Sequence, residues 1–233
     1  METRTEYVHQ LGQLHGEIEA MGAHVGRLLD MARTAETADE TPDAQATGKP
    51  RNALDIDRIE RASSDLAQRE RDIESLALRL LLLQQPVARD MREVSGALKA
   101  VTDLKRIGEL SLDICRFEAG LAERGSCVPQ RELEEMAAEV ASMVAIAVAS
   151  YCDGDLDKAQ SAIGMEDEID VHLHNLRDML VRGIYEKRVS AVDGIDVLMI
   201  AKNYERIGDH AENLAYWTEY VEKGTRDGRP YII

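Results

Sequence analysis

The chain has 233 residues, which suits one large domain or two small ones, and its 44% hydrophobic content is enough to form a core. The formal net charge of −16 argues against nucleic acid as a direct partner, because phosphate binding requires clustered Lys and Arg side chains. With one Trp and one Phe, the core is expected to consist of aliphatic side chains, as in packed helices.

The charge balance and the cysteines favour a cytoplasmic protein. The sequence contains 7 Lys, 21 Arg and 44 acidic residues, which suits the salt-rich cytoplasm of a halophilic archaeon; an ordinary acidic protein is the alternative. Cys115, Cys127 and Cys152 show no CxxC spacing, so free thiols are expected. The longest apolar run, residues 143–149, is far shorter than a membrane-spanning helix, and the N-terminus lacks the apolar stretch of a signal peptide.

The first half of the sequence predicts three helices and a linker. Apolar residues recur at alternating steps of four and three from Tyr7 to Ala32, the seam of a helix that packs at a shallow angle against its neighbours. Residues 36–52 lack this period and are rich in Thr, Asp, Ala, Gly and Pro, which predicts a mobile linker. A second helix is expected to begin near Asp55, and a third to have Pro86 in its first turn.

The second half predicts three more helices. It opens at Pro129, where the acidic residues of the first turn complement the helix dipole, and this helix stops at residues 153–155. The next helix is expected over about residues 156–187. Residues 190–193 have the spacing of a capping box ahead of the last helix, whose end is marked by Gly224.

The predicted fold is therefore all-α, with two tandem three-helix bundles. No alternating strand pattern competes with the helical periods anywhere along the chain. The predicted boundaries are residues 1–125 for the first bundle and residues 126–233 for the second.

An internal repeat supports this division into two similar halves. Residues 103–109 and residues 203–209 both contain Arg-Ile-Gly followed by an acid, and the acids and isoleucine of residues 70–74 align with those of residues 166–170. A glycine inside a helix costs about 1 kcal/mol relative to alanine. We therefore expect the repeated glycines, Gly108 and Gly208, to permit close approach of helices.

The repeats place pairs of acids four residues apart on one helical face. In the second half, the two pairs border the apolar seam at Ile169 and Ile207, and they are Glu166 with Asp170 and Glu205 with Asp209. If these helices pack along their seams, four carboxylates meet, which requires a cation or protonation. Oxygen ligands favour ions such as Mg, Mn, Ca or Fe over thiolate-bound zinc. The alternative is that these acids form solvated helix faces.

The other charged residues of the repeats have ordinary interpretations. Arg106 and Arg206 are expected to form surface ion pairs, and recognition of an anion is the alternative. His172 and His174 are two residues apart and point to different sides of a helix. His210 is expected to be a surface histidine, or else a peripheral ligand beside the acids. No phosphate loop or nucleophile signature is present, and we expect a protein that is not an enzyme.

These motifs resemble those of the PhoU family of phosphate-uptake regulators. The resemblance covers nearly the whole chain and rests on Gln-Gln-Pro-Val-Ala-Arg-Asp-Met-Arg at residues 84–92, on the two Arg-Ile-Gly-acid repeats, and most specifically on residues 205–213. Members of the family resemble two three-helix bundles whose acid-xxx-acid motifs hold metal ions. The resemblance thus implies a divalent or ferric ion (Fe, Mn, Mg or Zn) as the cofactor.

Carried onto this chain, the resemblance implies one metal site in each half. The second site consists of Glu166, Asp170, Glu205 and Asp209. The first consists of Glu70, Glu74 and Glu109, but Lys105 stands where the family pattern has an acid. An ammonium at that position would neutralise the carboxylates without a metal.

The resemblance also implies a function and partners. PhoU proteins are cytoplasmic negative regulators that link a phosphate ABC transporter, through its ATPase subunit, to a sensor histidine kinase. Such a protein would reach the membrane through its partners only, and a homodimer is expected. In archaea the kinase partner of related chains is an open question.

Two functions from other classes compete with this interpretation. A ferritin-like di-metal carboxylate enzyme would use Glu-xx-His motifs, and the spacing occurs here at Glu6 and His9 without a second copy. A helical adaptor that binds no metal is the third candidate. Metal analysis combined with oxidase assays separates the three.

Overall fold

The structure is a computed structural model that describes residues 2–36, 56–84, 86–126 and 129–231. Within these ranges the chain is almost entirely helical, which confirms the predicted fold class. The helices are α1 (Glu2–Glu36), α2 (Ile56–Gln84), α3 (Arg89–Arg124), α4 (Gln130–Asp153), α5 (Leu156–Ile163), α6 (Glu166–Tyr185) and α7 (Ala191–Lys223). The predicted linker, apart from its first residue Glu36, lies outside the described residues.

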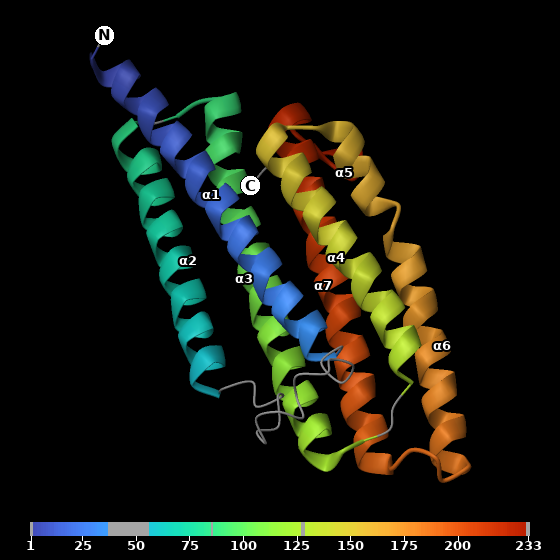
Figure 1. Cartoon of the computed structure of the whole chain (residues 1–233). Coiled ribbons are helices and arrows are strands. Elements are labelled where there is room, and N and C mark those ends of the chain that lie inside the picture. The colour runs from blue at the N-terminus through green and yellow to red at the C-terminus, as the bar shows by residue number, and fades with distance from the viewer. Residues whose placement is uncertain (1, 37–55, 85, 127–128, 232–233) are drawn as a thin grey trace.

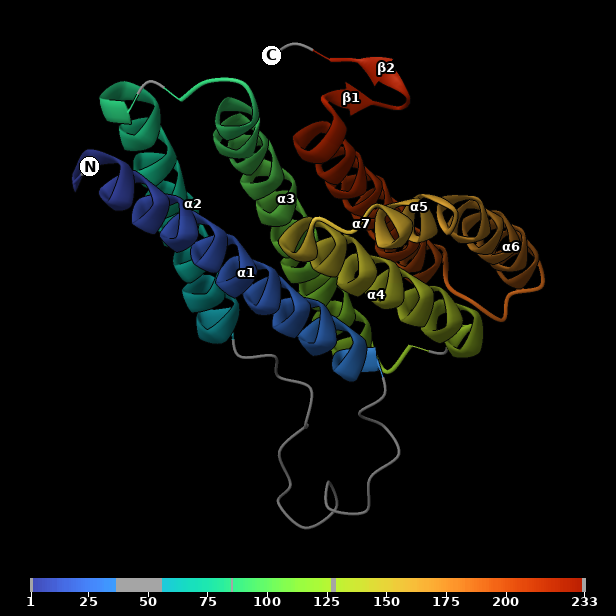
Figure 2. The same ribbon diagram turned by 90° about the horizontal axis from the view of Figure 1, so that it is seen from above.

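The helices form two bundles that lie side by side, as Figures 1 and 2 show. The first bundle contains α1, α2 and α3, and the second contains α4 and α7 together with α5 and α6. Helices α3 and α7, the last helices of the two halves, pack along each other in the middle of the molecule. They run antiparallel, because Ser95 near the start of α3 contacts Tyr220 near the end of α7, with 3.1 Å between the hydroxyl oxygens.

The core follows the predicted seams. The side chains of Leu14, Ile18, Met21 and Val25 in α1 are buried, at the steps of four and three that the sequence indicates. One buried cluster, composed mainly of aliphatic residues, continues through both bundles. Helical periodicity therefore located the core, since it depends only on which residues share a face of one helix.

Helix ends are specified by local residues in the second half. Asp155 caps α5, and its Oδ1 accepts hydrogen bonds from the backbone N–H groups of Asp157 (3.0 Å) and Lys158 (3.1 Å). Ser190 caps α7 as predicted, and its Oγ accepts from Asp193 N at 3.0 Å. Gly224 ends α7 with φ of 74°, a conformation that favours glycine.

Two predicted helix boundaries are wrong. The single helix expected over residues 156–187 is divided into α5 and α6, because backbone bonding tightens at Met165, whose N–H bonds to Ala162 O, three residues back. The third helix begins at Arg89 rather than around Pro86, since Ala88 has φ of 52° and cannot belong to a helix.

Two further features were not predicted. Residues Thr225–Arg226 (β1) and Arg229–Pro230 (β2) pair as a small antiparallel hairpin after α7. Helix α4 has the length and composition of a membrane-spanning helix, which the expectation from uninterrupted apolar runs missed. Its apolar residues Leu133, Met136 and Val140 belong to the core, where α4 packs on α1 and α7.

Candidate metal centres in the two repeats

In the first repeat, Lys105 occupies the centre of the predicted cluster. Its Nζ lies 2.8 Å from Glu70 Oε2, across the α2–α3 contact, and 3.8 Å from Glu109 Oε1 on its own helix. The hydrogen bond with Glu70 is the main cause that raises the pKa of Lys105, and the negative charges of Glu109 and Glu74 act in the same direction. The structure thus gathers all three predicted carboxylates around one ammonium.

This arrangement does not fit a metal ion. The position from which a cation would contact Glu70 and Glu109 is taken by a charge that belongs to the chain. A second positive group, Arg106, pairs with Glu109 at 2.6 Å, as expected for a surface ion pair. Opposite charges at these distances already favour the ionised carboxylates, so the first cluster needs no metal to form.

In the second repeat, negative charges gather without a lysine at the centre. Burial of Glu166, in the first turn of α6, raises its pKa, and the nearby negative charges of Asp170, Glu212, Asp167 and Asp209 raise it further. Asp209 and Glu212 belong to α7, so the contact between α6 and α7 brings acids of two helices together. Three of the four predicted ligands therefore influence one another electrostatically.

Glu205, the fourth predicted ligand, stands where Lys105 stands in the first repeat. Its side chain is only 15% exposed, and it pairs with Lys202 one turn earlier on α7. Its Oε2 atom is buried and has no hydrogen-bond partner within the described part of the chain. A buried carboxylate oxygen without a donor is costly, so this donor set fits a cation in a way that the first one does not.

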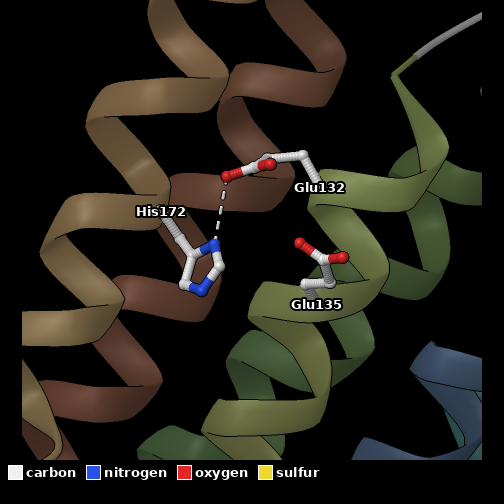
Figure 3. A group of neighbouring side chains, drawn as sticks. All are labelled: Glu132, Glu135 and His172. Carbon is white, nitrogen blue, oxygen red and sulfur yellow. Dashed lines mark hydrogen bonds and ion pairs between the residues drawn. The ribbon is translucent and has the colours of Figure 1, made fainter.

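The predicted carboxylates are gathered but not convergent. Among the described residues, the group of at least three potential ligands whose donor atoms all lie within 4.8 Å of one another is Glu132, Glu135 and His172, shown in Figure 3. The sequence analysis missed this group. Only packing of α4 against α6 joins residues forty positions apart, and no local spacing signals it.

The repeated glycines have the predicted role. A Cβ atom on Gly108 would lie 2.6 Å from Leu66 Cδ2 of α2, and one on Gly208 would lie 3.1 Å from Ile169 Cδ1 of α6. Each glycine thus leaves room for a side chain of the helix that also carries an acid pair of its bundle. The close contact places α2 beside α3, and α6 beside α7, along their acidic residues.

His210 is not the surface residue that the sequence suggested. Its Nδ1 lies 2.8 Å from Asp103 Oδ1, across the α3–α7 contact, and the His210 side chain is 21% exposed. Trp217 Nε1 donates a hydrogen bond to the other oxygen of Asp103 at 2.7 Å. Asp103 therefore links the two repeats, and its distance of more than a hundred positions from His210 concealed the pair in the sequence. His172 and His174 do face different partners, as predicted: His172 contacts Glu132, and His174 contacts the backbone oxygen of Asp170.

Arg106 and Arg206, the equivalent arginines of the two repeats, line one cavity of about 270 Å³. Ser63 of α2 contributes to its wall, together with Asp113 and Arg116 of α3. The cavity contains acids as well as arginines, and Glu109 and Asp113 already pair with two of them. It therefore gives no clear preference for an anion.

Comparisons with known proteins agree with this architecture. The family model of the PhoU domain matches residues 18–117 and residues 133–218. A phosphate-specific transport system accessory protein PhoU homolog of Clostridium acetobutylicum is 27% identical over 224 residues, which cover 95% of this chain and 96% of that protein. A homolog from Burkholderia is 29% identical over 222 residues, 93% of this chain and 92% of that protein.

A solved structure shows the same fold. The crystal structure of PhoU from Pseudomonas aeruginosa superimposes with a TM-score of 0.83 and 26% sequence identity, over 94% of this chain and 100% of that one. The family model matches well over half of the chain, once in each bundle. This protein, with its two bundles and repeated acid pairs, belongs to the PhoU family.

Proposed function

We propose that this protein regulates phosphate uptake by contact with a phosphate ABC transporter, through the ATPase subunit, and with a sensor histidine kinase. The support is that relatives matched over nearly their whole length carry the name of accessory proteins of the phosphate-specific transport system. The proposed protein acts in the cytoplasm, as a homodimer, and does not bind nucleic acid directly. The net charge of −16 supports the last point.

The proposed regulator holds a divalent or ferric ion (Fe, Mn, Mg or Zn) in its second repeat. The observation that carries this proposal is the buried Glu205 Oε2 without a hydrogen-bond partner in the described residues, next to acids that raise the pKa of Glu166. Glu166, Asp170, Glu205 and Asp209 would hold the ion. It would supply positive charge between α6 and α7, which Lys105 supplies between α2 and α3.

Metal content of protein purified without chelator tests this part. Glu205→Gln and Asp209→Asn should each lower the amount of bound metal, because each removes one anionic ligand, while the circular dichroism of the helices stays unchanged. Glu74→Gln, in the equivalent cluster of the first repeat, is the matched control and should leave the metal content as it is. Equal metal content in all four proteins would contradict the assignment.

Partner capture and phosphate uptake test the regulatory part. Affinity purification from phosphate-replete cells of the source organism should recover the ATPase subunit of a phosphate transporter. Deletion of the gene should increase phosphate uptake in phosphate-rich medium, and the full-length gene should restore it. Unchanged uptake, together with no transporter subunit among the captured proteins, would refute this function.

The structure gives less support to a ferritin-like enzyme. Glu6 and His9, which provide the Glu-xx-His spacing, both have exposed side chains near the start of α1 and do not face the core of a bundle. Glu6 instead accepts a hydrogen bond from Gln10 at 3.0 Å. An oxidase assay on the metal-loaded protein, run beside the metal analysis, separates the two functions.

A further inference from the structure

A histidine between two carboxylates joins α4 to α6 in the second bundle. His172 Nδ1 lies 3.1 Å from Glu132 Oε1, and its Nε2 lies 3.1 Å from Glu139 Oε2. Both acids belong to α4, two turns apart, and the ring lies between them. The side chain of His172 is 18% exposed, so the contact is largely shielded from solvent.

Proton counting shows that this contact lacks a positive charge. A neutral imidazole carries one N–H, so only one of the two ring nitrogens can donate a hydrogen bond. The other nitrogen then presents its lone pair to a carboxylate oxygen, which is repulsive. Glu139 Oε2 is buried and forms no well-aligned hydrogen bond with any described residue, so it too lacks compensation. A bound cation, or a second proton on the ring, resolves both problems.

A third carboxylate makes the metal ion the better solution. Figure 3 shows Glu135 next to Glu132 on α4, on the side that faces His172, and one donor atom from each of the three residues lies within 4.8 Å of the other two. In a tetrahedral site with bonds of about 2.1 Å, donor atoms are about 3.4 Å apart. The contact between His172 and Glu132 is already near that separation, at 3.1 Å.

We propose that His172 Nδ1, Glu132 and Glu135 bind a divalent transition ion of the zinc type, at a site separate from the repeated acids. Glu139 then holds the proton on Nε2 and orients the ring, as carboxylates behind histidine ligands commonly do. One nitrogen and two oxygens suit zinc and its neighbours better than magnesium or calcium. The competing ion pair, from Arg131 to Glu135, is exposed and worth little.

The site has a structural consequence. Glu132 and Glu135 lie in the first turns of α4, whereas His172 lies in α6, so a bound ion would connect the two helices directly. Three protein ligands leave one coordination position open to water or to a group of another molecule. This proposal does not rest on the regulatory function, because it uses none of the residues assigned to the repeats.

Zinc titration of the chelator-treated full-length chain tests the proposal. Wild type should bind one more zinc ion per chain than His172→Gln, or bind it at least tenfold more tightly, as measured by calorimetry. His174→Gln is the matched control, since His174 is exposed on the same helix and bonds only the backbone oxygen of Asp170. Glu139→Gln should keep the stoichiometry but weaken binding by about tenfold or more.

Two additional measurements keep the result interpretable. Long-range proton–nitrogen spectra of the six histidines should show zinc shifting the Nδ1 signal of His172. The exposed Glu135→Gln substitution provides a second loss of binding if His172→Gln does not fold. Repeating the titration in a Glu205→Gln background distinguishes this site from the repeated acids. Identical isotherms for wild type and His172→Gln, or a His172 ring that responds to pH but not to zinc, would overturn the proposal.

Discussion

Lys105 Nζ lies 2.8 Å from Glu70 Oε2, so the first repeat carries its own cation in the place where the second repeat has the acid Glu205. The two halves of the molecule share a fold and a motif, yet one substitution separates their electrostatics. The first cluster is compensated at all times. The second requires a positive charge from solution.

Exchanging this residue should make the halves alike. Lys105→Glu removes the ammonium and places a fourth carboxylate beside Glu70, Glu74 and Glu109, so we expect a second metal site and a higher metal content. In wild type, chelator should speed amide exchange around Asp209 while exchange around Glu109 stays slow, because the first cluster does not depend on metal. In the variant, both regions should respond. Lys99→Glu, an exposed change of equal charge on α3, is the control; a metal content equal to wild type in Lys105→Glu would refute the explanation.

The link between the repeats through Asp103 should be measurable by fluorescence. Asp103→Asn removes the charge from an acceptor shared by His210 and Trp217, and we expect a loss of about 1–3 kcal/mol in the free energy of unfolding. Trp217 is the only tryptophan, so its emission reports this contact directly. A double-mutant cycle with His210→Gln should give a coupling energy of about 1 kcal/mol.

The control for this prediction is Asp113→Asn, which removes an exposed acid that pairs with Arg116 on the same helix. It should change stability by less than about 0.5 kcal/mol, as is usual for surface pairs. If Asp103→Asn and Asp113→Asn have equal effects, Asp103 does not hold the repeats together.

Alanine substitutions test the close helix contacts at the repeated glycines. Gly108→Ala should destabilise the protein by about 1–3 kcal/mol, because the new methyl group would lie 2.6 Å from Leu66 Cδ2. Gly208→Ala should cost less, since its nearest neighbour, Ile169 Cδ1, is 3.1 Å away. Gly16→Ala in α1 has no neighbouring atom within 4 Å and should stabilise the protein by about 0.5–1 kcal/mol through helix propensity. Urea unfolding of the three variants gives the order, and a Gly108→Ala variant as stable as Gly16→Ala would disprove the packing role.

Glu118 should make stability depend on pH. Burial raises the pKa of this carboxyl from 4.5 to about 7, so the folded state binds the proton more tightly than the unfolded state. Stability from this group is therefore present at low pH and is lost as pH rises from about 4.5 to about 7. Relative to wild type, Glu118→Gln should become more stable by roughly 2–3 kcal/mol across this interval. The free energy of unfolding measured against pH checks this, with the exposed Glu123→Gln as control; parallel curves for wild type and Glu118→Gln would contradict it.

Features that depend on one helix were predictable from the sequence. The seam of α1, the cap at Ser190 and the end of α7 at Gly224 follow from local spacing and residue type. So did the exceptional Lys105, because the repeat provides an internal comparison. A single residue misled the analysis at Ala88, whose conformation no local rule indicates.

Pairs that join different helices were decided by the tertiary structure. Asp103 meets His210, and His172 meets Glu132, only because particular helices pack with a particular axial offset. A helical period shows which face of α3 or α6 is apolar, but it leaves the sliding and rotation of one helix along another undetermined. Those offsets are set by packing of many side chains at once, including the space left by Gly108 and Gly208. For this reason the sequence determined the two bundles and the acids of their repeats, whereas the three-dimensional packing decided which charges face one another.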